Sequence, residues 1–146
     1  MAKILDGKKL STEIRDELKQ DIKSLKEKGI VPGLAGILVG DDEGSATYVR
    51  LKEKAGEALG IHSEAVRLSK DATEEHLLKE IDRLNFDSEI HGIFIQLPLP
   101  EHIDENKALN AILPEKDVDG FHPMNVGKAW LGQEAFLPAT PDGIRE

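Results

Sequence analysis

Lys52 is the residue whose surroundings in the sequence most suggest chemistry. It lies between Gly40 and Ile61, a stretch typical of a loop followed by a helix, with Ser45 as the expected N-cap and Gly60 as the expected stop. At about 100° per residue, the apolar arc of this helix contains Lys52 together with Tyr48, Val49, Ala55 and Leu59. An ammonium on an apolar arc, one turn from a tyrosine, requires an explanation.

The spacing leaves two interpretations of Lys52 open. In the more common one, the aliphatic stem lies along the packed face and the charged end reaches water. In the other, the amine is held partly out of water and exchanges protons with a ligand near neutral pH.

Gln96 is a second candidate because it ends an apolar run. The run His91–Gln96 predicts a buried strand, and Pro98 and Pro100 end it because proline lacks the N–H that a sheet requires. An amide at this position either caps the strand end or contacts a ligand.

Asp117 and Asp119 are further candidates, in a loop between Pro114 and Phe121. Their spacing resembles the start of a calcium-binding loop, but the glutamate expected six residues after the glycine is absent, so we expect no metal. The two carboxylates either stabilise a turn or point at a ligand donor.

The elements that position these residues alternate along the chain. We expect helices over residues 8–28 and 104–112, one between the cap Ser45 and the stop Gly60, and one that begins after capping residues in 71–75 and ends near Asn85. We expect strands over 34–40, around 64–68 and over 91–96. The first helix has a stripe predicted to be buried, formed by Leu10, Ile14, Leu18, Ile22 and Leu25. This alternation predicts a three-layer α/β/α sandwich with a mainly parallel sheet, whose ligand lies at the carboxyl ends of the strands.

Composition limits the class of partner. The 146 residues fit one domain, and a net charge of −9 argues against nucleic acid or anionic membrane as the main partner. There is no cysteine, and residues 1–7 lack the apolar core of a secretion signal, so we expect a cytoplasmic protein. Near the end, Thr140 is the expected N-cap of a helix with Pro141 at its first position, and we expect a longer protein to continue it.

Four motifs together resemble one family. They occupy residues 39–52, 92–100, 114–127 and 138–144 and are similar, in order and spacing, to the bifunctional methylenetetrahydrofolate dehydrogenase/methenyltetrahydrofolate cyclohydrolase family. The resemblance covers essentially the whole chain and implies an amino-acid-dehydrogenase-like N-terminal fold. It implies a folate-binding catalytic domain over residues 1–120, then a connecting segment and the start of an NAD(P)-binding domain over 121–146. One departure is Ala139, where the family has cysteine.

The resemblance also implies residue roles. Lys52 would be the catalytic lysine that transfers protons, Tyr48 would stack on the folate and orient the lysine, and Gln96 would bind Lys52 and hold the hydrolytic water. Asp119 would accept hydrogen bonds from the pterin. The remaining residues expected to bind substrate or shape its pocket are Leu97, Pro98 and Pro100.

The implied activity is NADP-dependent oxidation of 5,10-methylenetetrahydrofolate to the 5,10-methenyl form, followed by hydrolysis to 10-formyltetrahydrofolate, in a homodimer. The cofactor domain would lie outside these residues, so no residue of this chain is expected to bind NADP and hydride transfer is not expected from it alone. Two alternatives are a stand-alone folate-binding module without turnover and the substrate domain of another dehydrogenase, such as the shikimate type.

Overall fold

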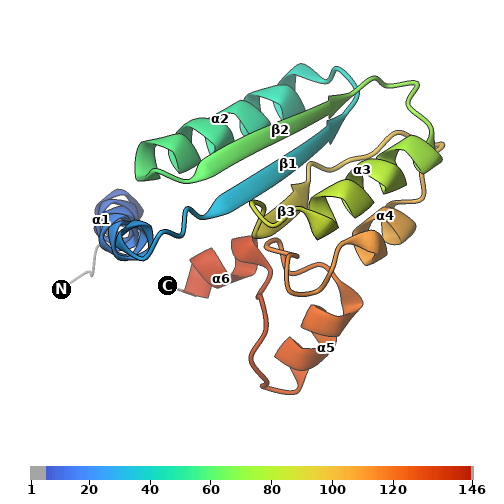
Figure 1. Cartoon of the computed structure of the whole chain (residues 1–146). Coiled ribbons are helices and arrows are strands. Elements are labelled where there is room, and N and C mark those ends of the chain that lie inside the picture. Colours follow the sequence, from blue (N-terminus) through green and yellow to red (C-terminus); the bar gives the residue numbers. More distant parts are fainter. Residues whose placement is uncertain (1–5, 146) are drawn as a thin grey trace.

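A parallel sheet covered by helices on both faces forms the centre of the molecule (Figure 1). The computed structural model describes residues 6–145, so the first five residues, used above to argue against a secretion signal, lie outside the described part. Its strands are β1 (Gly33–Val39), β2 (His62–Leu68) and β3 (Gly92–Ile95), in the order β2-β1-β3. The helices are α1 (Gly7–Glu27), α2 (Glu43–Leu59), α3 (Glu74–Phe86), α4 (Glu105–Ala111), α5 (Pro123–Trp130) and α6 (Ala139–Arg145).

The two faces of the sheet have separate apolar clusters because side chains alternate along each strand. One face carries the larger cluster, in which Ala35, Ile37 and Ile93 pack with buried residues of α3 and α4. The other face is covered by α2, whose Val49 is fully buried against Leu38 and Phe94. The expected three-layer α/β/α sandwich is therefore confirmed.

The prediction of a continuous buried stripe on α1 is wrong. Ile22 is buried, whereas Ile14 and Leu18 are 37% and 42% exposed and Leu10 and Leu25 are only half-buried. The physical reason is position: α1 lies at the edge of the molecule, beyond the sheet, so only part of its length meets α2 (Figure 1).

Two expected helix starts are also corrected. Asp42, not Ser45, caps α2: its carboxylate accepts a hydrogen bond of 2.7 Å from the Ser45 backbone N–H, so Ser45 lies inside the first turn. Gly60 ends α2 as expected, with a positive φ of 86°. The helix predicted to begin after Thr140 begins earlier, at Ala139, and the Asp142 N–H donates to the Pro138 carbonyl.

The sequence did not predict α5. This helix has little apolar periodicity, but it begins with a good local signal: His122 is its N-cap, with Nδ1 accepting from the Met124 N–H, and Pro123 occupies the first position. Its buried side chain is that of Asn125, which faces the loop carrying the two candidate aspartates.

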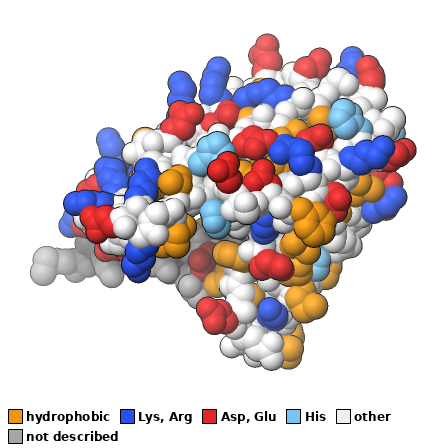
Figure 2. Space-filling model, viewed as in Figure 1, with side chains coloured by type: hydrophobic (Ala, Val, Ile, Leu, Met, Phe, Trp, Pro, Cys, Tyr) orange, Lys and Arg blue, Asp and Glu red, His pale blue; other side chains and the backbone are white. Residues whose placement is uncertain are grey.

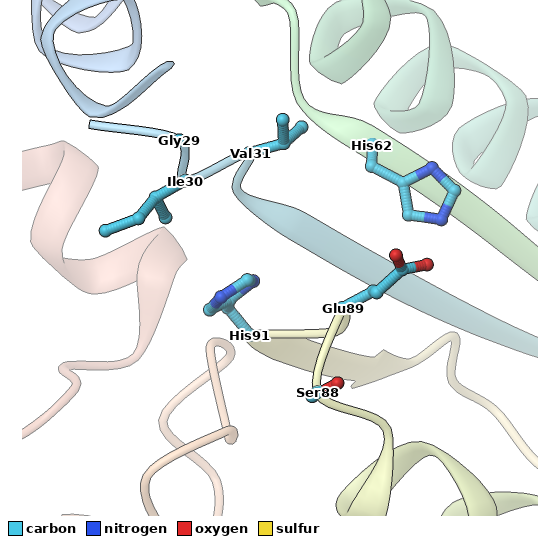
Figure 3. A pocket seen from close by; sticks show the side chains of 7 residues that line it. All are labelled: Gly29, Ile30, Val31, His62, Ser88, Glu89 and His91. Atoms are coloured by element: carbon cyan, nitrogen blue, oxygen red, sulfur yellow. The ribbon is translucent and has the colours of Figure 1, made fainter. Parts of the chain in front are cut away.

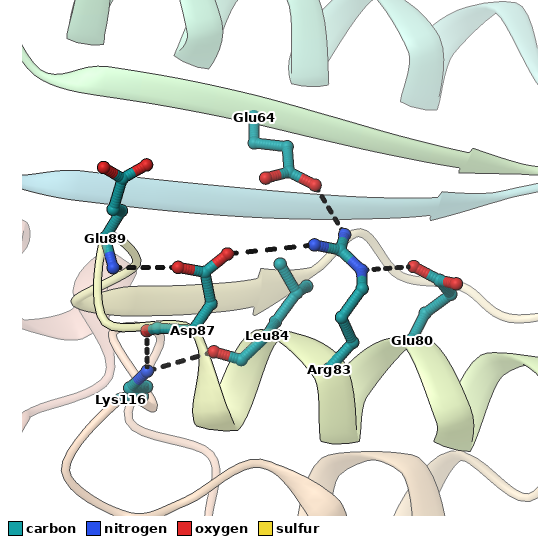
Figure 4. Close-up of polar contacts among 7 residues, drawn as sticks. All are labelled: Glu64, Glu80, Arg83, Leu84, Asp87, Glu89 and Lys116. Atoms are coloured by element: carbon teal, nitrogen blue, oxygen red, sulfur yellow. Dashed lines mark hydrogen bonds and ion pairs between the residues drawn. The ribbon is translucent and has the colours of Figure 1, made fainter.

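A polar network ties the end of α3 to its neighbours (Figure 4). Arg83 donates to Glu80 on its own helix and to Glu64 on β2, and its guanidinium lies 4.0 Å from Asp87. Lys116 Nζ donates to the carbonyl oxygens of Leu84 and Asp87, at 3.0 and 2.8 Å. A cation at the negative end of a helix is favourable, and here it also anchors the loop that follows α4.

Replacing Lys116 with methionine is expected to lower the free energy of unfolding by about 1–3 kcal/mol, because two half-buried carbonyls lose a charged donor. Urea unfolding monitored by circular dichroism measures the change. Lys79→Met is the matched control: its pair with Glu75 is exposed to water and should contribute little to stability. An equal effect of the two substitutions would contradict the anchoring role of Lys116.

Acidic and basic side chains are interspersed over the face shown in Figure 2. Among the described residues, no helix combines the length and apolar character required to cross a membrane.

Candidate functional site

The candidate site is a pocket of about 250 Å³ at the carboxyl end of β3. Segments far apart in the sequence meet there: the middle of α2, the end of β3, the loop before α5 and the beginning of α6. The residues that line it are Lys52, Ile95, Gln96, Leu97, Asp119, Phe121, Ala139, Thr140 and Pro141. Parallel α/β sheets bind ligands at this end of their strands, so this pocket is in the expected place.

Lys52 reaches the pocket from α2. Its side chain is exposed, and its Nζ lies 3.9 Å from the centroid of the Phe94 ring on β3. The lysine therefore neither points into bulk water away from the sheet nor becomes enclosed in the core. Its stem lies along the α2 face of the sheet and its charged end stands at the pocket.

The two aspartates of the acidic loop have different surroundings. Asp117 is 2% exposed, and its carboxylate accepts from the backbone N–H groups of Phe121 (3.2 Å) and His122 (2.8 Å) and from the Asn125 amide (2.9 Å). These three hydrogen bonds are internal to the fold, and they stabilise the turn. The turn interpretation of Asp117 is therefore confirmed.

Asp119 instead lines the pocket. Burial raises the pKa of its carboxyl group above the ordinary value, the nearby Lys52 opposes this, and the Asp117 charge adds to it. The loop is fixed beside β3 because Asp117 forms a parallel bridge with Ile93, and the Ile93 N–H donates to the Lys116 carbonyl at 2.7 Å. A half-buried carboxylate on a fixed loop is suited to accept hydrogen bonds from a ligand.

Gln96 also lines the pocket, immediately beyond β3. Its backbone N–H continues the sheet by donating to the Ile37 carbonyl at 2.8 Å, and its side-chain amide donates to the neighbouring Leu97 carbonyl at 2.9 Å. Within residues 6–145, no hydrogen bond joins Gln96 to Lys52. The amide oxygen of Gln96 has no recorded donor in the same range, so it can accept from a ligand or a water molecule.

Tyr48, Pro98 and Pro100 lie outside this pocket lining. Tyr48 is 64% exposed, one turn before Lys52 on α2, so it does not pack on the apolar arc as the helical projection suggested. Pro98 is exposed and follows Leu97 through a cis peptide bond, whereas Pro100 is half-buried. Tyr48 and Pro98 could meet only a ligand that extends beyond the pocket.

Sequence reasoning did not assign five of the lining residues to the site: Ile95, Phe121, Ala139, Thr140 and Pro141. It also missed Phe94, whose ring lies against the Lys52 ammonium. A signal for Phe94 was present: side chains alternate along a strand, so Phe94 shares a face with Gln96, two residues later. No local pattern links the beginning of α6 to the end of β3.

A larger pocket, of about 460 Å³, lies at the opposite, amino end of the strands (Figure 3). It is lined by Gly29, Ile30, Val31, His62, Ser88, Glu89 and His91. His91 is engaged in the fold, because its Nδ1 accepts from the Gly33 N–H at 3.0 Å. None of the candidate residues lies there, and ligands of parallel sheets bind at the other end, so we do not assign this pocket as the functional site.

The residues present do not fit a dinucleotide cofactor. In a dinucleotide-binding domain, the turn after the first strand is rich in glycine and presents the start of a helix to the pyrophosphate. Here that turn carries Asp41, Asp42 and Glu43, and the Asp42 carboxylate already occupies the start of α2. Negative charge at this position repels phosphate, so we assign no NADP contact to these residues.

The fold and the pocket define a parallel α/β domain with a pocket at the carboxyl end of β3, where a lysine, an amide and a carboxylate meet. The sequence of residues 5–119 matches the family described as "Tetrahydrofolate dehydrogenase/cyclohydrolase, catalytic domain". The chain belongs to this family, which confirms the resemblance seen in its motifs.

Individual relatives in sequence also belong to this family. The chain is 55% identical over 143 residues to the bifunctional protein FolD of Halalkalibacterium halodurans and 52% identical over 145 residues to that of Bacillus pumilus. These matches cover 98% and 99% of this chain and 51% of each relative. The chain therefore spans about half the length of these relatives.

Solved structures give the same result. The FolD methylenetetrahydrofolate dehydrogenase/cyclohydrolase of Campylobacter jejuni superposes with a TM-score of 0.96 at 51% identity, over 98% of this chain and 51% of that one. The FolD of Trypanosoma brucei, solved in complex with NADP cofactor and an inhibitor, superposes with a TM-score of 0.93 at 39% identity, over 99% of this chain and 50% of that one.

Proposed function

We propose that this chain provides the folate site of a bifunctional enzyme that oxidises 5,10-methylenetetrahydrofolate and hydrolyses 5,10-methenyltetrahydrofolate to 10-formyltetrahydrofolate. The observation that carries the proposal is the convergence of Lys52, Gln96 and Asp119 on one pocket from three separate segments. Family membership supports the same substrate class.

Asp119 is proposed to recognise the pterin. A pterin presents an amino group and a ring N–H side by side, and one carboxylate can accept from both. Leu97 and Phe121 add apolar surface to the pocket. Tyr48 and Pro98, exposed beside it, are proposed to contact the part of the folate that extends beyond the pocket.

Lys52 and Gln96 are proposed to act on the one-carbon group. A water molecule held by the Gln96 amide oxygen attacks the methenyl carbon, and Lys52 in its amine form takes a proton from that water as the C–O bond forms. The bond from this carbon to N5 then breaks as the new hydroxyl group gives up its proton and becomes a carbonyl, N5 takes up a proton, and the carbon remains on N10 as a formyl group. The net products are the formyl compound and the one proton taken by Lys52. The methenyl carbon is already electrophilic, so a positioned water and a base are sufficient.

Oxidation of the methylene form is proposed for the whole protein, with NADP as the acceptor, as suggested by the relative solved with that cofactor. Residues 1–120 are proposed as the folate-binding catalytic domain, and residues 121–146 as the connection to a cofactor domain. We further propose a homodimer in the cytoplasm.

Asp119→Ala is expected to weaken folate binding about 30- to 700-fold, since paired pterin donors lose a charged acceptor worth about 2–4 kcal/mol. Isothermal titration calorimetry with the 146-residue chain measures the dissociation constant. The raised pKa of Asp119 adds a pH dependence: affinity should fall as the pH drops through that pKa, and Asp119→Asn should abolish this fall. An unchanged dissociation constant in Asp119→Ala would show that the carboxylate points elsewhere.

A folate-binding module without turnover is the second candidate function. It is favoured by the exposure of Lys52, since the amine of a general base is usually less exposed to water than the Lys52 side chain is here. Loss of the methenyl absorbance on adding the chain separates the two candidates. Trp130, the sole tryptophan, is 91% exposed on α5 and absent from the pocket lining, so its fluorescence is a poor reporter of binding.

A further inference from the structure

The ring of Phe94 is held in place on the α2 face of the sheet. Phe94 is 4% exposed and packs with Leu38 and Val49. Its partner in the β1–β3 register is Gly36, and a Cβ atom at that glycine would lie 2.4 Å from Cζ of the ring. The absence of a side chain at Gly36 therefore creates the space that the ring fills, and the packed neighbours leave the ring little freedom to move.

The ammonium of Lys52 lies over this ring. Its distance of 3.9 Å to the ring centroid is well inside the range of about 6 Å over which a cation is attracted to an aromatic face. Asp119 feels the charge of Lys52, but within residues 6–145 no carboxylate approaches the Lys52 ammonium to ion-pair distance. The Phe94 ring is therefore a fixed group in contact with this charge.

We propose that Phe94 is a positioning residue for Lys52: the face of its ring holds the lysine side chain at the pocket, beside Gln96 and Asp119. An exposed lysine samples many rotamers, and the ring selects those that place the nitrogen at the end of β3: it attracts the ammonium form, and it offers the methylene groups of the stem a packing surface in the amine form as well. Gly36 contributes to the same positioning of Lys52, because a larger residue at position 36 would displace the Phe94 ring. The effect on catalysis rests on the proposed function of Lys52, whereas the contact itself does not.

Nuclear magnetic resonance of the 146-residue chain, labelled with ¹³C-lysine, tests the contact without any substrate. A ring face shields protons above it, so the ε-methylene signal of Lys52 should lie upfield of the other lysine signals, and it is assigned by its loss in Lys52→Arg. Phe94→Leu should return this signal to the range of the other lysines. Incorporating 3,5-difluorophenylalanine at position 94, which weakens the charge distribution of the ring while keeping its shape, should move it partway.

Leu38→Val is the matched control, because it loosens the same cluster and leaves the ring in place. It should lower thermal stability but keep the shielded Lys52 signal. If the wild-type Lys52 signal is not shielded, or if it stays shielded in Phe94→Leu, the proposed contact is wrong.

Kinetics then test the consequence. Phe94→Leu should lower kcat for methenyl-folate hydrolysis about two- to fivefold, the change in an equilibrium that a cation–π contact at an exposed site produces, with the folate dissociation constant within twofold of wild type. Leu38→Val should leave kcat unchanged. A shielded signal lost in Phe94→Leu without any change in kcat would show that the contact is only structural.

The two proposals fail in different ways. If Lys52→Met leaves turnover unchanged, the proposed function of Lys52 fails, while the resonance experiment still decides whether Phe94 holds the side chain. If the resonance experiment fails while Lys52→Met abolishes turnover, the positioning role of Phe94 is the part that is wrong.

Discussion

Replacing Lys52 with methionine is expected to lower the rate of methenyl-folate hydrolysis by the chain about 10²- to 10⁴-fold, the usual contribution of a positioned general base. Methionine keeps much of the aliphatic stem but cannot exchange a proton, so folate binding should change much less than turnover. The measurement is the loss of methenyl absorbance over time under saturating substrate, combined with calorimetric binding.

Two control variants make this result specific. Lys52→Arg retains the positive charge and can still lie over the Phe94 ring, but arginine does not lose its proton at ordinary pH. It should therefore be as inactive as Lys52→Met if proton transfer is the role, and largely active if only charge matters. Lys54→Met removes an exposed lysine two residues away and should have no effect. Equal rates for the wild type and Lys52→Met would remove Lys52 from the mechanism.

Asp117→Ala is expected to lower the free energy of unfolding by about 3–5 kcal/mol, because three donors in a buried turn lose their acceptor at once. These donors are the backbone N–H groups of Phe121 and His122 and the side chain of Asn125. Urea unfolding measures the change. Asp117→Asn should lie between Asp117→Ala and the wild type, since the amide keeps one accepting oxygen.

Asp119→Ala is the matched control for Asp117→Ala, two residues along the same loop. Its carboxylate accepts no recorded hydrogen bond within residues 6–145, and burial raises its pKa, so the folded chain holds the Asp119 charge at a cost. Removing it should therefore change stability at neutral pH by less than about 1 kcal/mol, while strongly reducing folate affinity. If both substitutions destabilise equally, the distinction between a structural and a ligand-binding aspartate is wrong.

The sequence predicted the layered fold well because its signals are local and repeated. The apolar run of β1 indicates a strand, and the apolar spacing along α3 indicates a helix. It failed where position in the whole molecule decides the outcome. The apolar residues of α1 are correctly periodic but lie at the edge of the molecule, and α5 is held by a polar side chain, Asn125, which periodicity does not reveal.

The candidate residues illustrate the same limit. Residue types, their spacing and the family motifs together identified Lys52, Gln96 and Asp119 as candidate site residues and left Asp117 open. Types and spacing left the two aspartates equivalent, and the resemblance singled out Asp119. The tertiary structure supplies the physical difference: Phe121, His122 and Asn125 donate hydrogen bonds to the Asp117 carboxylate, whereas Asp119 lines the pocket. It also supplied the aromatic ring beneath Lys52, a contact between an α2 residue and a β3 residue that no local pattern encodes. Chain composition decides which groups are available for chemistry, whereas their distances and exposure to water depend on segments that meet only after folding.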